Sequence, residues 1–354
     1  MPTDSQIFVR RWTNLSIGVA IGIGVLLVFL AVGPAFIAGP VVDRLTVLFI
    51  YVSLAVMWNA LAGYGGMVSV GQQAFFGLGG YLAIRLTEWG MAPYPAIIFA
   101  PLLAGLIAVP IAPVMLRLRG GEFAIGTWII AEVIRLLVSL DPIIQGDTGR
   151  SLIALTTYNA DLRRNLAYWL GLACMVLMLG LVFVMLRSRL GSSIQAIRDN
   201  EEAAASIGVK VLSTKLVIFI MAAIGCALAG GVWLATFLTF QPLSFFGIQW
   251  SAYMIFMVLV GGIGSFEGPI LGAVIFFLIE TWFGASGVWY LIALGSSALL
   301  FSLFLPKGIW GYINNRFQLH LLPVGYRVVT PHTPGGNAML SADLALADDP
   351  SEKL

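Results

Sequence analysis

Uncharged, mostly apolar runs recur along this chain, and several are long enough to cross the hydrocarbon core of a bilayer as a helix. Charged residues make up only 10% of the sequence, against 59% hydrophobic residues. A soluble domain carries about 25% charge, so a surface with this composition could not stay hydrated. The sequence therefore predicts an all-α integral membrane protein.

About ten membrane spans can be placed on these runs. The third, eighth and ninth spans are short and interrupted by glycine, so the sequence allows between eight and eleven crossings. No small-residue cleavage site follows the first span, which is therefore expected to remain as a helix. The spans lie at about Leu15–Val32, Leu45–Ala62, Ala74–Thr87, Pro95–Leu116, Phe123–Leu140, Leu166–Leu186, Leu216–Phe240, Ile248–Ile263, Pro269–Gly284 and Val288–Leu305.

The positive charges outside the spans indicate an orientation. Ten crossings put both termini on one side, and cytoplasmic segments of membrane proteins are rich in Lys and Arg. With both termini cytoplasmic, the internal segments hold Arg10, Arg11, Arg117, Arg119, Arg187, Arg189, Arg198, Lys210, Lys215, Lys307, Arg316, Arg327 and Lys353. The external loops hold only Arg44, Arg150, Arg163 and Arg164. The sequence thus predicts that both termini are cytoplasmic.

Three stretches lie outside the predicted spans. An external loop covers residues 141–165, and a cytoplasmic loop covers residues 187–215. A C-terminal tail, residues 312–354, contains prolines and an acidic end, and it is expected to be a flexible cytoplasmic segment. None of these stretches is long enough for a sizeable soluble domain, so residues 1–311 are expected to form one membrane domain.

The usual parts of a catalytic or energy-converting site are missing from the sequence. No lysine follows a glycine, which excludes the GxxxxGK[ST] phosphate-binding loop. The only histidines, His320 and His332, fall in the tail, so an HExxH zinc site or a histidine-based triad cannot form within the membrane. We therefore expect no enzyme activity, metal site or cofactor in this chain. The net charge of +2 gives no basic field for nucleic acid.

The cytoplasmic loop carries the most informative local pattern. Asn200 is a candidate N-cap for a short helix over Glu201–Ile207, with acids in its first turn. Gly208 would stop that helix, and residues 194–198 suggest another helical turn just before it. A two-helix elbow with small alanine side chains on one side would suit the docking of another protein. The alternative is an ordinary amphipathic loop between two membrane helices.

Sequence motifs relate this loop to a known class of proteins. Glu202-Ala203-Ala204 followed by Gly208 matches the EAA-xxx-G coupling loop of importer permeases of the ATP-binding-cassette (ABC) class. The wider string over residues 189–201, Arg-Leu-Gly-x-x-x-x-Ala-Ile-Arg-Asp-Asn-Glu, resembles a narrower family. That family is the LivM-type permeases of high-affinity branched-chain amino acid importers.

Two glycine-rich segments resemble the same family. Residues 63–81 read Gly-Tyr-Gly-Gly-Met-Val-Ser-Val-Gly-Gln-Gln-Ala-Phe-Phe-Gly-Leu-Gly-Gly-Tyr. Residues 261–273 read Gly-Gly-Ile-Gly-Ser-Phe-Glu-Gly-Pro-Ile-Leu-Gly-Ala. Since the three motifs occur in the family's order, over about residues 44–306, the chain is identified by resemblance as a LivM-type permease.

This resemblance implies a membrane-spanning subunit of an ATP-driven importer in the bacterial cytoplasmic (inner) membrane. The implied partners are a homologous second permease, two cytoplasmic ATP-binding subunits and an extracytoplasmic substrate-binding protein. ATP and magnesium would bind to the partner subunits and not to this chain. The implied substrate is leucine, isoleucine or valine, while close relatives carry urea and short amides. The residues expected to couple to the ATPase are Arg198, Asn200, Glu201, Glu202, Ala203, Ala204 and Gly208.

The sequence departs from the family's pattern at two places. Gly71-Gln72 stands where the family commonly has Gly-His, and glutamine cannot titrate near neutral pH. A pH-dependent role at this position is therefore not expected. The external Gly146-Asp147-Thr148-Gly149 resembles the family's glycine-rich loop after the fifth span only loosely, which leaves the substrate range open.

Some polar and glycine residues within the spans are candidates for the translocation pathway. Glu132 and Arg135 are three residues apart and share a helix face, so they either border the pathway or form a structural ion pair. The two glycine-rich segments share the spacing Gly-Gly-x-x-Ser and each precedes a short span. Such interruptions either expose backbone at a transport site or allow close helix packing. The pathway candidates are Gly65, Gly66, Ser69, Gln72, Gln73, Glu132, Arg135, Gly262 and Ser265.

Two other functions remain compatible with the sequence. An ion-coupled secondary transporter of small solutes would need a buried acid, and Glu132 could serve. A membrane scaffold or lipid-processing enzyme is a further alternative, although no catalytic group supports it. Transport by an ion-coupled secondary transporter would run on an ion gradient without ATP.

Overall fold

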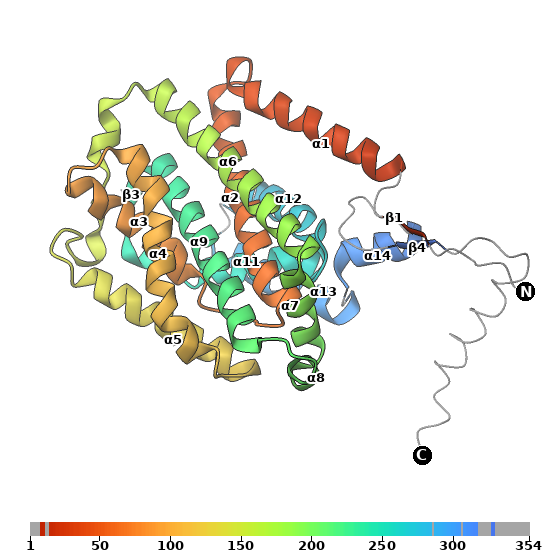
Figure 1. The fold of residues 1–354 in the computed structure, drawn as a ribbon. Helices are drawn as coiled ribbons and strands as arrows, with labels where there is room; N and C mark the ends of the chain where they lie inside the picture. Colours follow the sequence, from red (N-terminus) through yellow and green to blue (C-terminus); the bar gives the residue numbers. More distant parts are fainter. Residues whose placement is uncertain (1–7, 11–13, 285–286, 306, 318–326, 330–354) are drawn as a thin grey trace, which may run out of the picture. The chain divides into compact units, whose positions relative to one another are not determined.

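The computed structural model describes residues 8–10, 14–284, 287–305, 307–317 and 327–329 (Figure 1). The chain divides into two units, residues 1–22 with 320–354 and residues 23–319. In the first unit, β1 (Phe8–Arg10) pairs antiparallel with β4 (Arg327–Val329). The second unit contains the helical bundle and all of the candidate site residues.

Helices lie at all ten predicted spans, and this confirms that the chain is all-α. The mostly apolar runs specify these helices, and most ends fall within a few residues of the prediction. The helices are α1 (Asn14–Val32), α2 (Gly39–Asn59), α3 (Gln73–Glu88), α4 (Pro93–Met115), α5 (Gly120–Ser139), α6 (Ala160–Arg187), α9 (Val211–Phe237), α11 (Gln249–Gly261), α12 (Gly268–Phe283) and α13 (Val288–Phe304).

Seven helical segments within the described residues are long and apolar enough to cross a membrane. The helices α3 and α12 have only 16 residues each, and α5 carries Glu122, Glu132 and Arg135. The number of crossings and the cytoplasmic placement of both termini therefore stay predictions. The seven segments are Ser16–Ala35, Gly39–Tyr64, Pro93–Met115, Ala160–Arg187, Val211–Phe237, Pro242–Gly261 and Ile292–Phe317.

Shorter elements connect the long helices. The cytoplasmic loop predicted at residues 187–215 contains α7 (Arg189–Asp199) and α8 (Glu201–Ser206), which we call the elbow. The π-helix η2 (Ala60–Tyr64) extends α2. The remaining connecting elements are η1 (Gly33–Ala35), η3 (Gly146–Thr148), β2 (Arg150–Ser151), η4 (Ile153–Thr157), β3 (Thr239–Phe240), α10 (Pro242–Phe245) and α14 (Gly308–Phe317).

The C-terminal tail begins inside a helix. Residues 312–317 belong to α14, so the structure places a helix where the start of a flexible tail was predicted. Residues 318–326 and 330–354, which make up most of that predicted tail, lie outside the described residues.

The core of the bundle is built around α2, which is buried on every side from Phe49 to Asn59 and contacts α6, α9, α11 and α12. A helix that is apolar all round is expected to lie inside. Glycines bring α3 and α9 into close contact, since a Cβ at Gly79 would overlap the Ala227 carbonyl oxygen and one at Gly230 would overlap the Phe76 carbonyl oxygen.

Polar contacts show at which end of the bundle each connecting segment lies. At the elbow end, Arg198 Nη1 donates to Gly63 O and Arg119 lies 4.0 Å from Glu201. At the opposite end, which we call the distal end, β2 pairs with β3. The distal end also holds the ion pairs Arg85–Asp141, Arg150–Glu88 and Arg164–Asp43. From α2 to α9, the long helices thus run alternately from one end of the bundle to the other.

Candidate functional site

The elbow begins with side-chain caps on both of its helices. Ser188 Oγ accepts a hydrogen bond from Leu190 N (3.2 Å) at the start of α7. Asn200 Oδ1 accepts one from Ala203 N (3.0 Å) at the start of α8, so the predicted N-cap is confirmed. Glu201 occupies the first turn of α8, where the helix dipole favours negative charge. The local sequence thus specifies where each short helix begins.

Gly208 stops α8, as predicted. Its φ is +89°, a conformation that side chains with a Cβ rarely adopt. Gly208 N donates to Ala205 O (3.0 Å), and Val209 N donates to Ala204 O (3.1 Å). These two bonds form a Schellman motif. The helix ends at Ser206, one residue before the predicted end.

The surface of α8 combines small and apolar side chains. Ala203 and Ala205 are exposed, whereas Ala204 packs inward and is 2% exposed. Ile207, at the end of the helix, is 79% exposed. Because alanine projects only a methyl group, another protein surface could approach α8 closely here.

Charged side chains anchor the elbow to two membrane helices. Arg198 Nη1 donates to Gly63 O (3.1 Å) at the end of α2, and its Nη2 lies 2.8 Å from Asp199 Oδ1. Lys215 Nζ, in the first turns of α9, lies 2.8 Å from Glu201 Oε2. The Lys215 side chain is only 11% exposed. A displacement of the elbow would therefore pull on α2 and α9. Figure 1 shows α7 and α8 in green beside these helices.

Asn59 joins the end of α2 to the second glycine-rich segment. Its Nδ2 donates to Ser265 O (2.9 Å), and its Oδ1 accepts from Gly264 N (2.9 Å). Asn59 lies at the end of α2, just before the first glycine-rich segment. Asn59 is not among the site residues that the sequence predicts. The sequence feature that could have indicated it is an amide side chain within an apolar span, close before a glycine-rich segment.

The second glycine-rich segment is a tight turn between α11 and α12. Gly262 has a φ of +135°. Ser265 Oγ donates to Gly262 O (2.6 Å) and accepts from Gly268 N (3.1 Å), so it caps the start of α12 from within the turn. Both pathway candidates in this segment thus lie at the elbow end and stabilise the turn.

The first glycine-rich segment borders a cavity at the elbow end. The cavity has a volume of about 480 Å³ and is lined by the segment, the α4–α5 connection and the elbow. Gly65 and Gly66 line it together with Arg119, Arg198 and Glu201. Gly66 has a φ of +67° and packs against the Arg198 side chain. Two pathway candidates therefore lie against the predicted coupling residues.

The start of α3 lies in the packed interior. Trp58 Nε1 donates to Ser69 O (2.8 Å), and Ser251 Oγ donates to Gln73 Oε1. Gln72 is fully buried, and neither its Nε2 nor its Oε1 has a hydrogen-bond partner among the described residues. An unpaired buried amide costs free energy, so the amide of Gln72 is a strained position within the described part of the chain.

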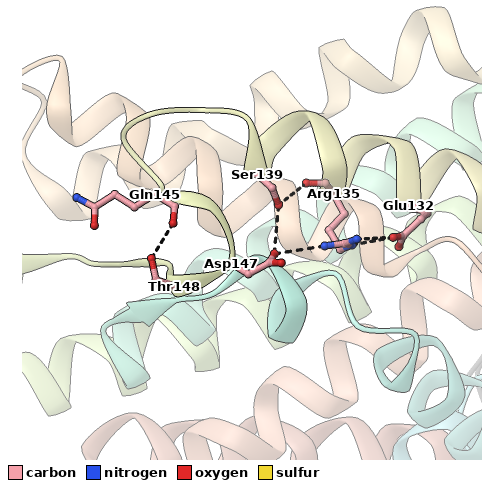
Figure 2. A network of polar contacts seen from close by, with 6 residues as sticks. All are labelled: Glu132, Arg135, Ser139, Gln145, Asp147 and Thr148. Atoms are coloured by element: carbon pink, nitrogen blue, oxygen red, sulfur yellow. Dashed lines mark hydrogen bonds and ion pairs between the residues drawn. The ribbon is translucent and has the colours of Figure 1, made fainter.

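Glu132 and Arg135 share a face of α5, as their spacing predicts (Figure 2). Arg135 Nη2 lies 2.6 Å from Glu132 Oε1, and Arg135 Nη1 lies 3.3 Å from Asp147 Oδ1. Asp147 belongs to η3 at the distal end. The pathway candidates thus fall into three separate places, namely the turns at the elbow end, the buried start of α3 and the face of α5.

Comparison with known proteins identifies the family. The family model described as "Branched-chain amino acid transport system / permease component" matches residues 40–305. The chain belongs to this family. The membership confirms the resemblance to LivM-type permeases that the three sequence motifs indicated.

Individual relatives of this permease are consistent with the family match. The high-affinity branched-chain amino acid transport system permease protein LivM of Escherichia coli is 26% identical over 80% of this chain and 73% of its own length. LivM of Salmonella typhimurium gives the same values. The L-arabinose transport system permease protein AraH of Escherichia coli is 33% identical, over 32% of this chain and 34% of its own length. No solved structure matches the permease.

The family and the helices together define the class of protein. The permease is a multi-pass protein of the bacterial inner membrane and a component of a transport system. Within it, the matched region contains the elbow, both glycine-rich segments and the face of α5.

Proposed function

We propose that this chain is the membrane-spanning permease subunit of an ATP-driven ABC importer that moves branched-chain amino acids into the cytoplasm. The elbow carries the proposal, because its capped helices present an alanine-bearing surface while charged residues anchor it to α2 and α9. The family description and the names of the LivM relatives support the substrate class.

In this proposal the elbow is cytoplasmic and docks into one of two partner ATP-binding subunits, which bind ATP and magnesium. Residues 198–208 supply the contact surface, with Ala203 and Ala205 pointing outward. When the ATPase pair closes, the elbow moves as a unit. The contacts of Arg198 with Gly63 and of Lys215 with Glu201 pass that movement to α2 and α9.

Transport then proceeds by alternating access. A second, homologous permease would complete the pathway, and an extracytoplasmic binding protein would deliver the substrate. The ATPases can drive the change only if they bind the two states of the membrane helices with different affinities. Asn59 ties the second glycine-rich segment to the end of α2, and Arg198 contacts Gly63 at the start of the first segment, so both segments would move together with the elbow.

Reconstituted transport tests the proposal. The chain would be co-purified with the second permease, the ATP-binding subunits and the binding protein, and inserted into vesicles. We expect leucine uptake that requires ATP on the elbow side and the binding protein on the other side. Uptake driven by a sodium or proton gradient without ATP would instead identify an ion-coupled carrier and contradict the proposal.

A further inference from the structure

The helix α5 presents one face that nothing in the described part of the chain covers. Its buried residues all lie on the opposite side: Phe123, Thr127, Ala131, Ile134 and Val138. The uncovered face carries Trp128, Glu132 and Arg135, and η3 places Asp147 beside them. We call Glu132, Arg135 and Asp147 the α5 ion cluster (Figure 2).

The guanidinium of the cluster lies behind the two carboxylates. The Arg135 side chain is 15% exposed, whereas the side chains of Glu132 and Asp147 are 50% and 52% exposed. Arg135 Nε and Nη2 both donate to Glu132 Oε1, at 2.9 and 2.6 Å. Arg135 Nη1 and Ser139 Oγ both contact Asp147 Oδ1, at 3.3 and 3.4 Å. Arg135 therefore orients both carboxylates toward the uncovered side.

This arrangement leaves one negative charge and two acceptor atoms unused. Two carboxylates face one guanidinium, and neither Glu132 Oε2 nor Asp147 Oδ2 has a hydrogen-bond partner within the described residues. Lipid cannot solvate such a cluster, so ionised groups on a membrane helix face a water-filled path or a protein partner. Free carboxylate oxygens with a net negative charge suit a cation that donates several hydrogen bonds, such as a primary ammonium group.

We propose that Glu132 and Asp147 form a recognition site for the α-ammonium group of the amino-acid substrate, with Arg135 as the positioning residue that holds the two carboxylates. The inference rests on the proposed transport function and deepens it by assigning a substrate contact. Trp128 lies one helical turn before Glu132 and is 47% exposed, so it can contact the aliphatic side chain. The site faces the water-filled path that the second permease would close.

The triple variant Glu132→Gln/Arg135→Gln/Asp147→Asn tests this role in the reconstituted complex. It removes all three charges together, so it leaves no unpaired ion behind. We expect the complex to assemble and to hydrolyse ATP at its basal rate. The maximal rate of leucine uptake should fall at least about tenfold, because charge-assisted hydrogen bonds to the ammonium group are lost. The KM, which the binding protein sets, should change little. The matched control is Glu88→Gln, which removes a carboxylate paired with Arg150 at the same end.

The possible outcomes separate the alternatives. Wild-type uptake by the triple variant would show that the cluster is only a structural ion pair and would overturn the inference. Loss of the second permease from the purified triple variant would show that the cluster is a subunit contact, which would also overturn it. Failure of the unmodified complex to transport leucine with ATP would count against the proposed function instead.

Discussion

The helix α8 of the elbow and the helix α3 at the distal end both end at a glycine with the same backbone geometry, but the two helix ends expose different surfaces. Gly208 has a φ of +89° and Gly90 a φ of +92°. Gly90 belongs to a Schellman motif like that of Gly208, since Gly90 N donates to Thr87 O and Met91 N donates to Leu86 O. A Cβ at either glycine would meet no atom within 4 Å. The geometry of the stop therefore does not by itself distinguish the elbow from the distal end of α3.

The two helix ends differ in the side chains that precede the glycine. The distal stop follows a membrane helix and is preceded by Trp89, which is 73% exposed, as is typical of the membrane interface. The elbow stop follows a helix of six residues whose exposed side chains include Ala203 and Ala205. Such a short helix depends on its caps and on the Lys215–Glu201 contact. A docking surface thus arises from a small-residue helix held outside the membrane.

The largest expected effect comes from replacing the two stops. Gly208→Val should reduce ATP-driven uptake by about a hundredfold or more, whereas Gly90→Val should leave it within about twofold. Both variants place a β-branched residue at positive φ, which costs about 1–3 kcal/mol. Only at Gly208 does that strain unwind the proposed docking helix. Uptake of labelled leucine and co-purification of the ATPases would measure the difference. Equal losses in the two variants would contradict a special role for the elbow.

The second prediction concerns the links between segments at each end. Asn59→Leu removes both hydrogen bonds to the second glycine-rich segment and leaves Ser265 O and Gly264 N without their partner. We expect a loss of about 2–5 kcal/mol in stability and about a tenfold slower uptake. The distal-end counterpart, Tyr81→Phe, removes the bond to Asp141 Oδ2 (2.7 Å) and the longer one from Arg85 Nε (3.4 Å), and it should slow uptake little because Arg85 and Asp141 keep their own ion pair. Thermal unfolding and uptake assays would check both, and normal uptake by Asn59→Leu would refute the link.

The third prediction compares the two neighbouring glutamines at the start of α3, which lie in the packed interior. Gln72→Leu removes a buried amide that has no hydrogen-bond partner among the described residues, and it should raise stability by about 1–3 kcal/mol. Gln73→Leu should lower stability, because it leaves the Ser251 hydroxyl unpaired. If the amide of Gln72 finds a partner in another state of the transport cycle, Gln72→Leu should also slow uptake severalfold. A less stable Gln72→Leu variant, or one with unchanged uptake, would show that this part of α3 is not involved.

The smallest effect is expected from single ion pairs at the two ends. Glu201→Gln weakens the contact with Lys215 at the elbow and should cost about 1 kcal/mol in stability. It should also lower the ratio of substrate transported to ATP hydrolysed by about twofold. Glu88→Gln breaks the Arg150 pair at the distal end and should leave this ratio unchanged. Paired measurements of hydrolysis and uptake would detect the difference, and an equal ratio in both variants would argue against transmission through Glu201.

Much of the fold could be predicted from the sequence, because local chemistry determines it. Apolar runs located the ten helices, and the capping roles of Asn200 and Gly208 followed from residue types that favour helix ends. The contacts of Arg198 with Gly63 and of Lys215 with Glu201 could not be predicted. They join residues from different helices, and their pairing depends on how the helices pack.

The translocation candidates show the same limit. The spacing of Glu132 and Arg135 correctly predicted a shared helix face, yet the third member of the cluster, Asp147, comes from the following loop. Ser69 and Gln73 are polar residues near glycine, and the structure places both in hydrogen bonds of the packed interior, while their role in translocation stays a prediction. Polarity within an apolar run marks a constrained position but does not reveal which group constrains it.

The most direct test of the proposed function measures from which side of the membrane the elbow can be labelled, and whether the ATP-binding subunits protect it. Ala205→Cys, in a background where the buried Cys174 and Cys226 are replaced by alanine, offers one exposed thiol on α8. A membrane-impermeant maleimide should label it from the cytoplasmic side only, and bound ATP-binding subunits should block that labelling. Labelling from the external side, or labelling that the ATP-binding subunits do not affect, would contradict the claim that they move this permease by gripping the elbow.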